Sequence, residues 1–155
     1  LPIIFELIGE GSNKKNLQKL VKKNNLDNII IFKNFMDTKK LAKYIRNSNA
    51  LLVCLKKGEA LSSTLPAKFQ TYIAYGKPIF TFKGNIVSNL INKHKIGFTL
   101  AENNFKDVIN KFLKMNKNEI KNIHLRSRNL FYGFFEIEKN VSNLEKFINK
   151  KLNEK

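Results

Sequence analysis

The sequence has little of what disulfide, metal-binding or membrane-spanning proteins need. Its single cysteine, Cys54, lies in an apolar stretch, so no internal disulfide can form and a reducing compartment fits. The two histidines, His94 and His124, are isolated from any second ligand at metal-site spacing, so we expect no metal or other cofactor. No apolar run approaches the roughly 18–20 residues that span a bilayer, and no signal-peptide pattern is present. We therefore expect a cytoplasmic protein, with attachment to the inner face of the membrane left open.

Acidic residues are also scarce, since 12 Asp and Glu stand against 29 Lys and Arg, and the formal net charge is +17. Such a charge is typical of proteins that attract nucleic acid, anionic lipid or negatively charged substrates. The lysines, however, recur on helix faces opposite the apolar residues rather than in one block. We interpret most of the charge as a solvated surface of compositional origin. An anionic membrane surface stays a candidate partner, and no specific nucleic acid is expected.

Length and patterning predict the fold class. With 155 residues and a hydrophobic content of 43%, the chain can bury one core. Short apolar runs alternate with amphipathic helical stretches, which predicts an α/β fold: a doubly wound, Rossmann-like parallel sheet of about five strands with helices on both faces. After residue 100 only helical spacing remains, so the C-terminal helices should pack alongside. The predicted strands are residues 3–8, 29–32, 50–55, 79–82 and 97–100.

One strand–loop–helix unit carries the groups that a phosphate needs. A Ser/Thr loop follows the strand at 50–55 and enters a helix at Pro66, with Thr64 or Leu65 at the cap. Backbone N–H groups at a helix N-terminus bind anions, and ligands of open α/β sheets bind outside the carboxyl ends of strands. The hydroxyls of Ser62, Ser63 and Thr64, with Lys68 one turn into the helix, would surround that anion. The alternative is an ordinary capped helix with an exposed lysine.

A second turn, Gly9-Glu10-Gly11, is the first half of a dinucleotide-binding fingerprint. Lys14 occupies the position of the third glycine, and no acidic residue ends the second strand, because Phe32 is followed by Lys33. Nicotinamide chemistry is therefore not supported. The alternative for this segment is a tight turn that needs a positive φ.

Four segments in this order resemble a known family: LIGEGS at 7–12, IFKNFM at 31–36, NALLV at 49–53 and LPAKFQTYIAYGKPI at 65–79. Together they resemble the C-terminal, donor-binding domain of GT-B glycosyltransferases of the group 1 type, above all bacterial enzymes of capsule, O-antigen or exopolysaccharide synthesis. The resemblance covers roughly residues 3–148. It implies a hexosyl-type transferase that moves a sugar from a nucleotide diphosphate to a polysaccharide or lipid-linked acceptor, and it implies that no metal is needed.

The resemblance also implies where the donor binds. The turn at Gly9, Gly11 and Ser12 would line the cleft, and the loop at Phe35 and Met36 would lie near the base. The diphosphate or sugar would face a third set: Ser62, Ser63, Thr64, Leu65 and Lys68. Many members carry two glutamates spaced E-x(7)-E, whereas this sequence holds Ser63 and Thr71 there. The usual ribose-binding carboxylate thus has no evident replacement, and Thr71 joins the candidate donor-binding residues.

Members of the family that this sequence resembles are longer: an acceptor domain comes first, and their donor domain begins one strand and one helix earlier. We therefore expect residues 1–155 to form a single nucleotide-sugar-binding domain, a fragment that lacks the N-terminal acceptor domain and the first strand and helix of the donor domain, and that is inactive alone. Without that first strand, we expect the strands at 3–8 and 50–55 to pair directly. The main alternative is a non-enzymatic, flavodoxin-like binding module whose basic surface binds nucleic acid or membrane. A nucleotide-sugar epimerase is a third reading, for which the sequence shows no acidic and histidine cluster.

Overall fold

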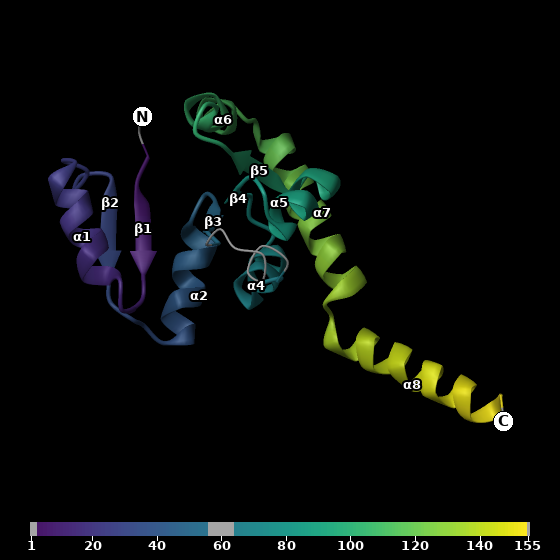
Figure 1. Ribbon diagram of the computed structural model, residues 1–155. Coiled ribbons are helices and arrows are strands. Elements are labelled where there is room, and N and C mark those ends of the chain that lie inside the picture. Colours follow the sequence, from purple (N-terminus) through teal and green to yellow (C-terminus); the bar gives the residue numbers. More distant parts are fainter. Residues whose placement is uncertain (1–2, 56–63, 155) are drawn as a thin grey trace. The chain divides into compact units, whose positions relative to one another are not determined.

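Five short strands alternate with helices in the described part of the chain, residues 3–55 and 64–154 of a computed structural model (Figure 1). The chain divides into two units, residues 1–46 and 47–155, and each is described by itself. The first contains β1 (Phe5–Ile8), α1 (Lys14–Lys23), β2 (Ile30–Lys33) and nearly all of α2 (Thr38–Asn47). The second contains β3 (Leu51–Val53), α4 (Ala67–Tyr75), β4 (Ile79–Phe82), α5 (Ile86–His94), β5 (Gly97–Leu100), α6 (Phe105–Leu113), α7 (Lys117–Phe134) and α8 (Ile137–Asn153).

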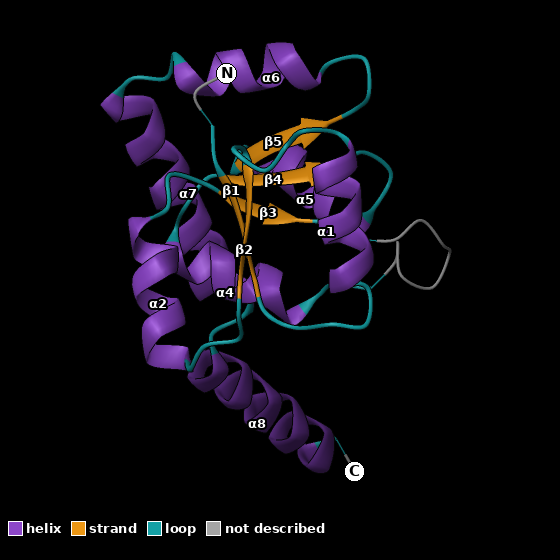
Figure 2. Cartoon of the chain, turned by 90° about the vertical axis from the view of Figure 1, so that its left-hand side faces the viewer, coloured by secondary structure: helices purple, strands orange, loops and turns teal. Residues whose placement is uncertain are grey.

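Every strand pair among the described residues is parallel. β1 pairs with β2, and the second unit has the order β3-β4-β5, seen in Figure 2. The predicted α/β class with parallel strands is confirmed. The predicted direct pairing of the strands at 3–8 and 50–55 would join the two units, and it stays a prediction. A crossover helix joins each of these pairs, as parallel pairing requires.

The core of the second unit lies where α4, α5 and α7 meet the three-stranded sheet. On α4, Phe69 and Ile73 are four residues apart, share one helix face and are fully buried. Tyr72 is partly buried and packs against the same core. The core cluster consists of Val53, Phe69, Ile73, Ile79, Val87, Ile91, Ile96 and Leu130.

Buried polar groups tie this core together. The Thr81 hydroxyl on β4 donates to the carbonyl oxygen of Val53 on β3 at 2.9 Å. The Asn85 side chain donates to the carbonyl oxygen of Phe82 at 2.8 Å and accepts from the backbone N–H of Ser88 at 2.9 Å, which caps α5. Because a buried polar group without a partner is costly, this network fixes how β3, β4 and the start of α5 fit together.

The first unit is packed less completely. Val21 and Ile45 are its only buried hydrophobic residues among those described, and Leu7 in β1 is 37% exposed. The continuous apolar run at 3–8 suggests a strand buried on both faces, and this expectation is wrong. In β1 the two middle residues are exposed and the two end residues are half-buried.

α8 presents its apolar stripe to solvent and has no buried residue. Ile137 is 76% exposed and Phe147 59% exposed. Within the described residues, no helix is both long and apolar enough to cross a membrane.

Substituting Gly76→Ala should destabilise the protein. Gly76 ends α4 with φ +69°, and an added Cβ would lie 2.3 Å from Nδ1 of His124 on α7. We expect a loss of about 1–3 kcal/mol, from the left-handed backbone and the clash together. Gly133→Ala is the matched control, because it lies within α7 and an added Cβ meets nothing within 4 Å. Urea unfolding would measure both. Equal midpoints for the two variants would contradict this account of Gly76.

Candidate functional site

In the first unit, two predicted segments meet at the carboxyl end of the sheet. The turn after β1 holds Gly9 at φ +134°, which confirms the positive φ expected of a tight turn. Its N–H donates to the carbonyl oxygen of Lys33 at 3.2 Å, at the end of β2. The structure therefore brings the turn of Gly9, Gly11 and Ser12 beside the segment that leads into Phe35 and Met36. In this loop Phe35 is 77% exposed and Met36 is half-buried.

Lys14 and Glu10 hold these two segments together. The Lys14 ammonium donates to Glu10 Oε1 at 2.7 Å, to Asn34 Oδ1 at 3.1 Å and to the Lys33 carbonyl oxygen at 3.4 Å. The hydrogen bond from Lys14 lowers the pKa of the Glu10 carboxyl, with a smaller contribution from the backbone N–H of Phe35. Sequence reasoning treated Lys14 only as a departure from a fingerprint. The i,i+4 spacing of Glu10 and Lys14 was the signal available for their pairing.

Lys33 anchors α2 to the sheet. Its ammonium lies 2.7 Å from Glu6 Oε1 and donates to the Tyr44 hydroxyl at 3.3 Å, with the Tyr44 ring below it. The hydrogen bond with Glu6, and then that with Tyr44, raises the pKa of Lys33. This lysine is occupied by protein groups from β1 and α2, and so it supports the edge of the sheet rather than a ligand.

In the second unit, the described candidate residues lie just before α4 or within it: Thr64, Leu65, Lys68 and Thr71. Pro66 occupies the N-cap position itself and provides no side-chain cap, and its carbonyl oxygen accepts from the N–H of Phe69 at 2.9 Å. The prediction that Thr64 or Leu65 sits at the cap is therefore wrong. The helix begins one residue later because Pro66 keeps an extended backbone, ψ 143°, while its carbonyl already accepts the first helical bond.

The other predicted residues of this segment have different environments. Lys68 is exposed in the first turn of α4, whereas the Leu65 side chain packs against the core. The Thr71 hydroxyl donates to the carbonyl oxygen of Ala67 at 3.4 Å, so it bonds to its own helix. Ser62 and Ser63 lie outside the described residues. The first-unit and second-unit groups are thus each assembled within their own unit.

Cys54 and Lys68 interact at the carboxyl end of β3. Partial burial raises the pKa of the Cys54 thiol, and the positive charge of Lys68 lowers it in part. Burial, with a further contribution from Cys54, raises the pKa of the Tyr72 hydroxyl.

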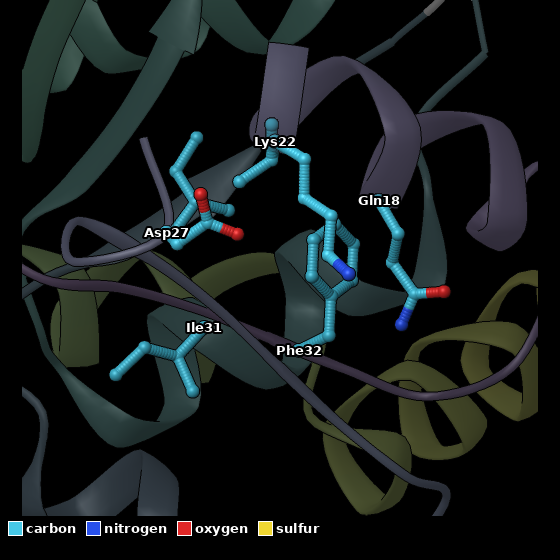
Figure 3. A pocket seen from close by; sticks show the side chains of 7 residues that line it. Gln18, Lys22, Asp27, Ile31 and Phe32 are labelled. Carbon is cyan, nitrogen blue, oxygen red and sulfur yellow. The ribbon is translucent and has the colours of Figure 1, made fainter. Parts of the chain in front are cut away.

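A hollow of about 370 Å³ in the first unit lies elsewhere (Figure 3). Its lining comes from the second half of α1, from the segment that connects α1 to β2, and from the first three residues of β2. The candidate residues lie at the carboxyl end, and we do not assign a ligand to this hollow. Its lining residues are Gln18, Val21, Lys22, Asp27, Ile30, Ile31 and Phe32. Among the residues that the structure describes, no group of three or more His, Cys, Asp or Glu could hold a metal.

Residues 2–130 match the family model described as glycosyl transferases group 1. The chain belongs to this family. The match includes both groups of candidate residues, at the ends of β1 and β2 and at the start of α4. It thereby confirms the family resemblance of the four sequence segments. No curated protein matched the sequence in a search of such proteins.

Solved structures of similar fold agree with this assignment. Alr3699/HepE from Anabaena, solved in complex with UDP, is similar with a TM-score of 0.74 at 13% identity, over 97% of this chain and 42% of that one. Sucrose-phosphate synthase from Thermosynechococcus elongatus gives 0.71 at 14% identity, over 97% and 39%. WaaG, a glycosyltransferase involved in lipopolysaccharide biosynthesis, gives 0.63 at 15% identity, over 83% and 33%. The chain thus spans less than half the length of these proteins.

Replacing Lys68 should make Cys54 less acidic. In Lys68→Met the thiol loses a nearby cation, so its pKa should rise further and the alkylation rate at neutral pH should fall. Alkylation by iodoacetamide across a pH series, on the chain's single cysteine, measures this directly. Lys117→Met on α7 is the charge-matched control. An unchanged pH profile in Lys68→Met would show that Lys68 does not face the end of β3.

Proposed function

We propose that residues 1–155 act as one donor-binding domain of a glycosyltransferase, which holds a nucleotide-diphosphate sugar. The sugar, of the hexosyl type, would pass to a polysaccharide or lipid-linked acceptor, as in synthesis of capsule, O-antigen or exopolysaccharide. Family membership supports this proposal, as do the fold neighbours solved with UDP and with UDP-glucose. Both groups of candidate residues also lie at carboxyl ends of parallel strands, the usual place for ligands in this architecture.

The observation that carries the proposal is the N-terminus of α4. Its N-cap is a proline that offers no capping side chain, so the first N–H groups can point at an anion, where the helix dipole also favours negative charge. Lys68 adds a cation in the same turn. In the proposed mechanism these groups neutralise the diphosphate as it leaves the sugar, and this electrostatic stabilisation replaces a metal ion. Thr64, Leu65 and Thr71, with Ser62 and Ser63, would complete the surroundings of the diphosphate and sugar.

The nucleoside would lie against the first unit's edge. Gly9, Gly11 and Ser12 in the turn after β1 have no side chain or a small one, and the exposed Phe35 beside Met36 offers a ring face on which a base can stack. An acceptor domain would provide the binding site for the acceptor and the groups that activate it. Residues 1–155 alone would therefore not catalyse transfer of the sugar. We place the protein in the cytoplasm, with its net charge of +17 favouring contact with an anionic inner membrane surface.

Nucleotide sugars should raise the melting temperature of the protein. At a concentration about 100 times Kd, binding adds about 2.7 kcal/mol of stability, which for a chain of this length is a rise in melting temperature of roughly 5–11 °C. UDP-glucose, GDP-mannose and dTDP-glucose would be compared by differential scanning fluorimetry. Lys68→Met should weaken binding of the effective donor about tenfold, through loss of a charge-assisted hydrogen bond, while Lys117→Met should not.

A different result would favour the binding-module alternative. Steeply salt-dependent binding to DNA or to anionic vesicles, with no thermal shift from any nucleotide sugar, would contradict the donor-domain proposal. If Lys68→Met leaves the thermal shift unchanged, the protein still binds a nucleotide sugar, but the proposed role of the N-terminus of α4 is contradicted.

A further inference from the structure

The Lys14 side chain connects the turn after β1 to the end of β2 through three hydrogen bonds. Its side chain is only 16% exposed, and its ammonium donates to Glu10, to Asn34 and to the carbonyl oxygen of Lys33. A lysine ammonium has three hydrogens, so these three acceptors use its donors fully. Glu10 belongs to the turn after β1, and the other two acceptors belong to the end of β2. Lys14 therefore fixes one turn to the other and is not arranged to contact a ligand phosphate.

Phe35, the residue after Asn34, relates these hydrogen bonds of Lys14 to ligand binding. Phe35 directly follows Asn34, and its ring is 77% exposed. The backbone N–H of Phe35 also contributes to the lowered pKa of Glu10, which places the start of this loop near the same carboxylate. An exposed ring on a loop that is fixed before binding loses less conformational entropy when a base stacks on it.

We propose that Lys14 and Glu10 are positioning residues that hold Phe35 as the stacking platform for the nucleobase. This inference rests on the proposed function, because it requires a bound nucleoside diphosphate. Neither side chain touches the ligand in this scheme. Lys14 acts through Asn34 and the end of β2, and Glu10 acts by orienting the Lys14 ammonium.

A double-mutant cycle in the intact protein tests the proposal. UDP, GDP, ADP and dTDP would be titrated by calorimetry, and the tightest ligand used for the variants. We expect Lys14→Met to weaken the binding of that ligand about tenfold. A loss of this size lies within the range of affinity that stacking of a base on an aromatic ring contributes. In a Phe35→Ala background the same substitution should have little further effect, because the platform is already gone. Glu10→Gln should behave like Lys14→Met, to a smaller extent.

Two further variants separate positioning from folding. Lys14→Arg keeps a cation with several donors and should restore most of the affinity, whereas Lys15→Met, next to it on α1, should change nothing. A tenfold loss that is the same with and without Phe35 would overturn the proposal, as would Lys14→Met binding like the wild type. If the wild type binds none of the four nucleotides and no nucleotide sugar, the proposed function itself fails, which is a separate result.

Discussion

The packing of α4 against the three-stranded sheet is the constraint on which the candidate diphosphate site depends. Phe69 and Ile73 are fully buried one turn apart, and burial of each such side chain is worth about 1.5–3 kcal/mol. Held in this way, α4 cannot slide or rotate, so its first turn stays at the carboxyl end of β3. Gly76 completes the arrangement, because only a residue without a side chain lets α4 end where α7 passes.

The lysines of this chain have three different roles. Lys14 and Lys33 are each occupied by several protein acceptors and serve the edge of the first unit's sheet. Lys68 is exposed beside the start of α4 and is the one that the proposed chemistry uses. Most others lie on exposed helix faces, consistent with the interpretation of the net charge as mainly a solvated surface. The positions of Lys14, Lys33 and Lys68 therefore indicate more about function than the net charge of +17 does.

Local elements could be predicted from the sequence, and long-range pairing could not. The apolar runs at 79–82 and 97–100 have the same bounds as β4 and β5, because glycine or proline precedes or begins each strand. The turn at Gly9 and the segment before Phe35 also follow β1 and β2, as expected. Pairing of parallel strands depends on contacts far apart in the chain, which the residue pattern of one segment does not contain. The role of Lys14 was missed for the same reason: two of its three acceptors lie about twenty residues away.

In the described part of the second unit, taken by itself, β3 lies at one edge of the sheet, and this position has a consequence for how this unit behaves in a crowded solution. An edge offers unpaired backbone groups that can recruit extended segments of other molecules and so begin amyloid-like growth. Charged side chains often discourage such recruitment, but β3 consists of Leu51, Leu52 and Val53 and carries none. Its protection is its brevity, because a template of three residues offers too few hydrogen bonds to hold an intruding strand.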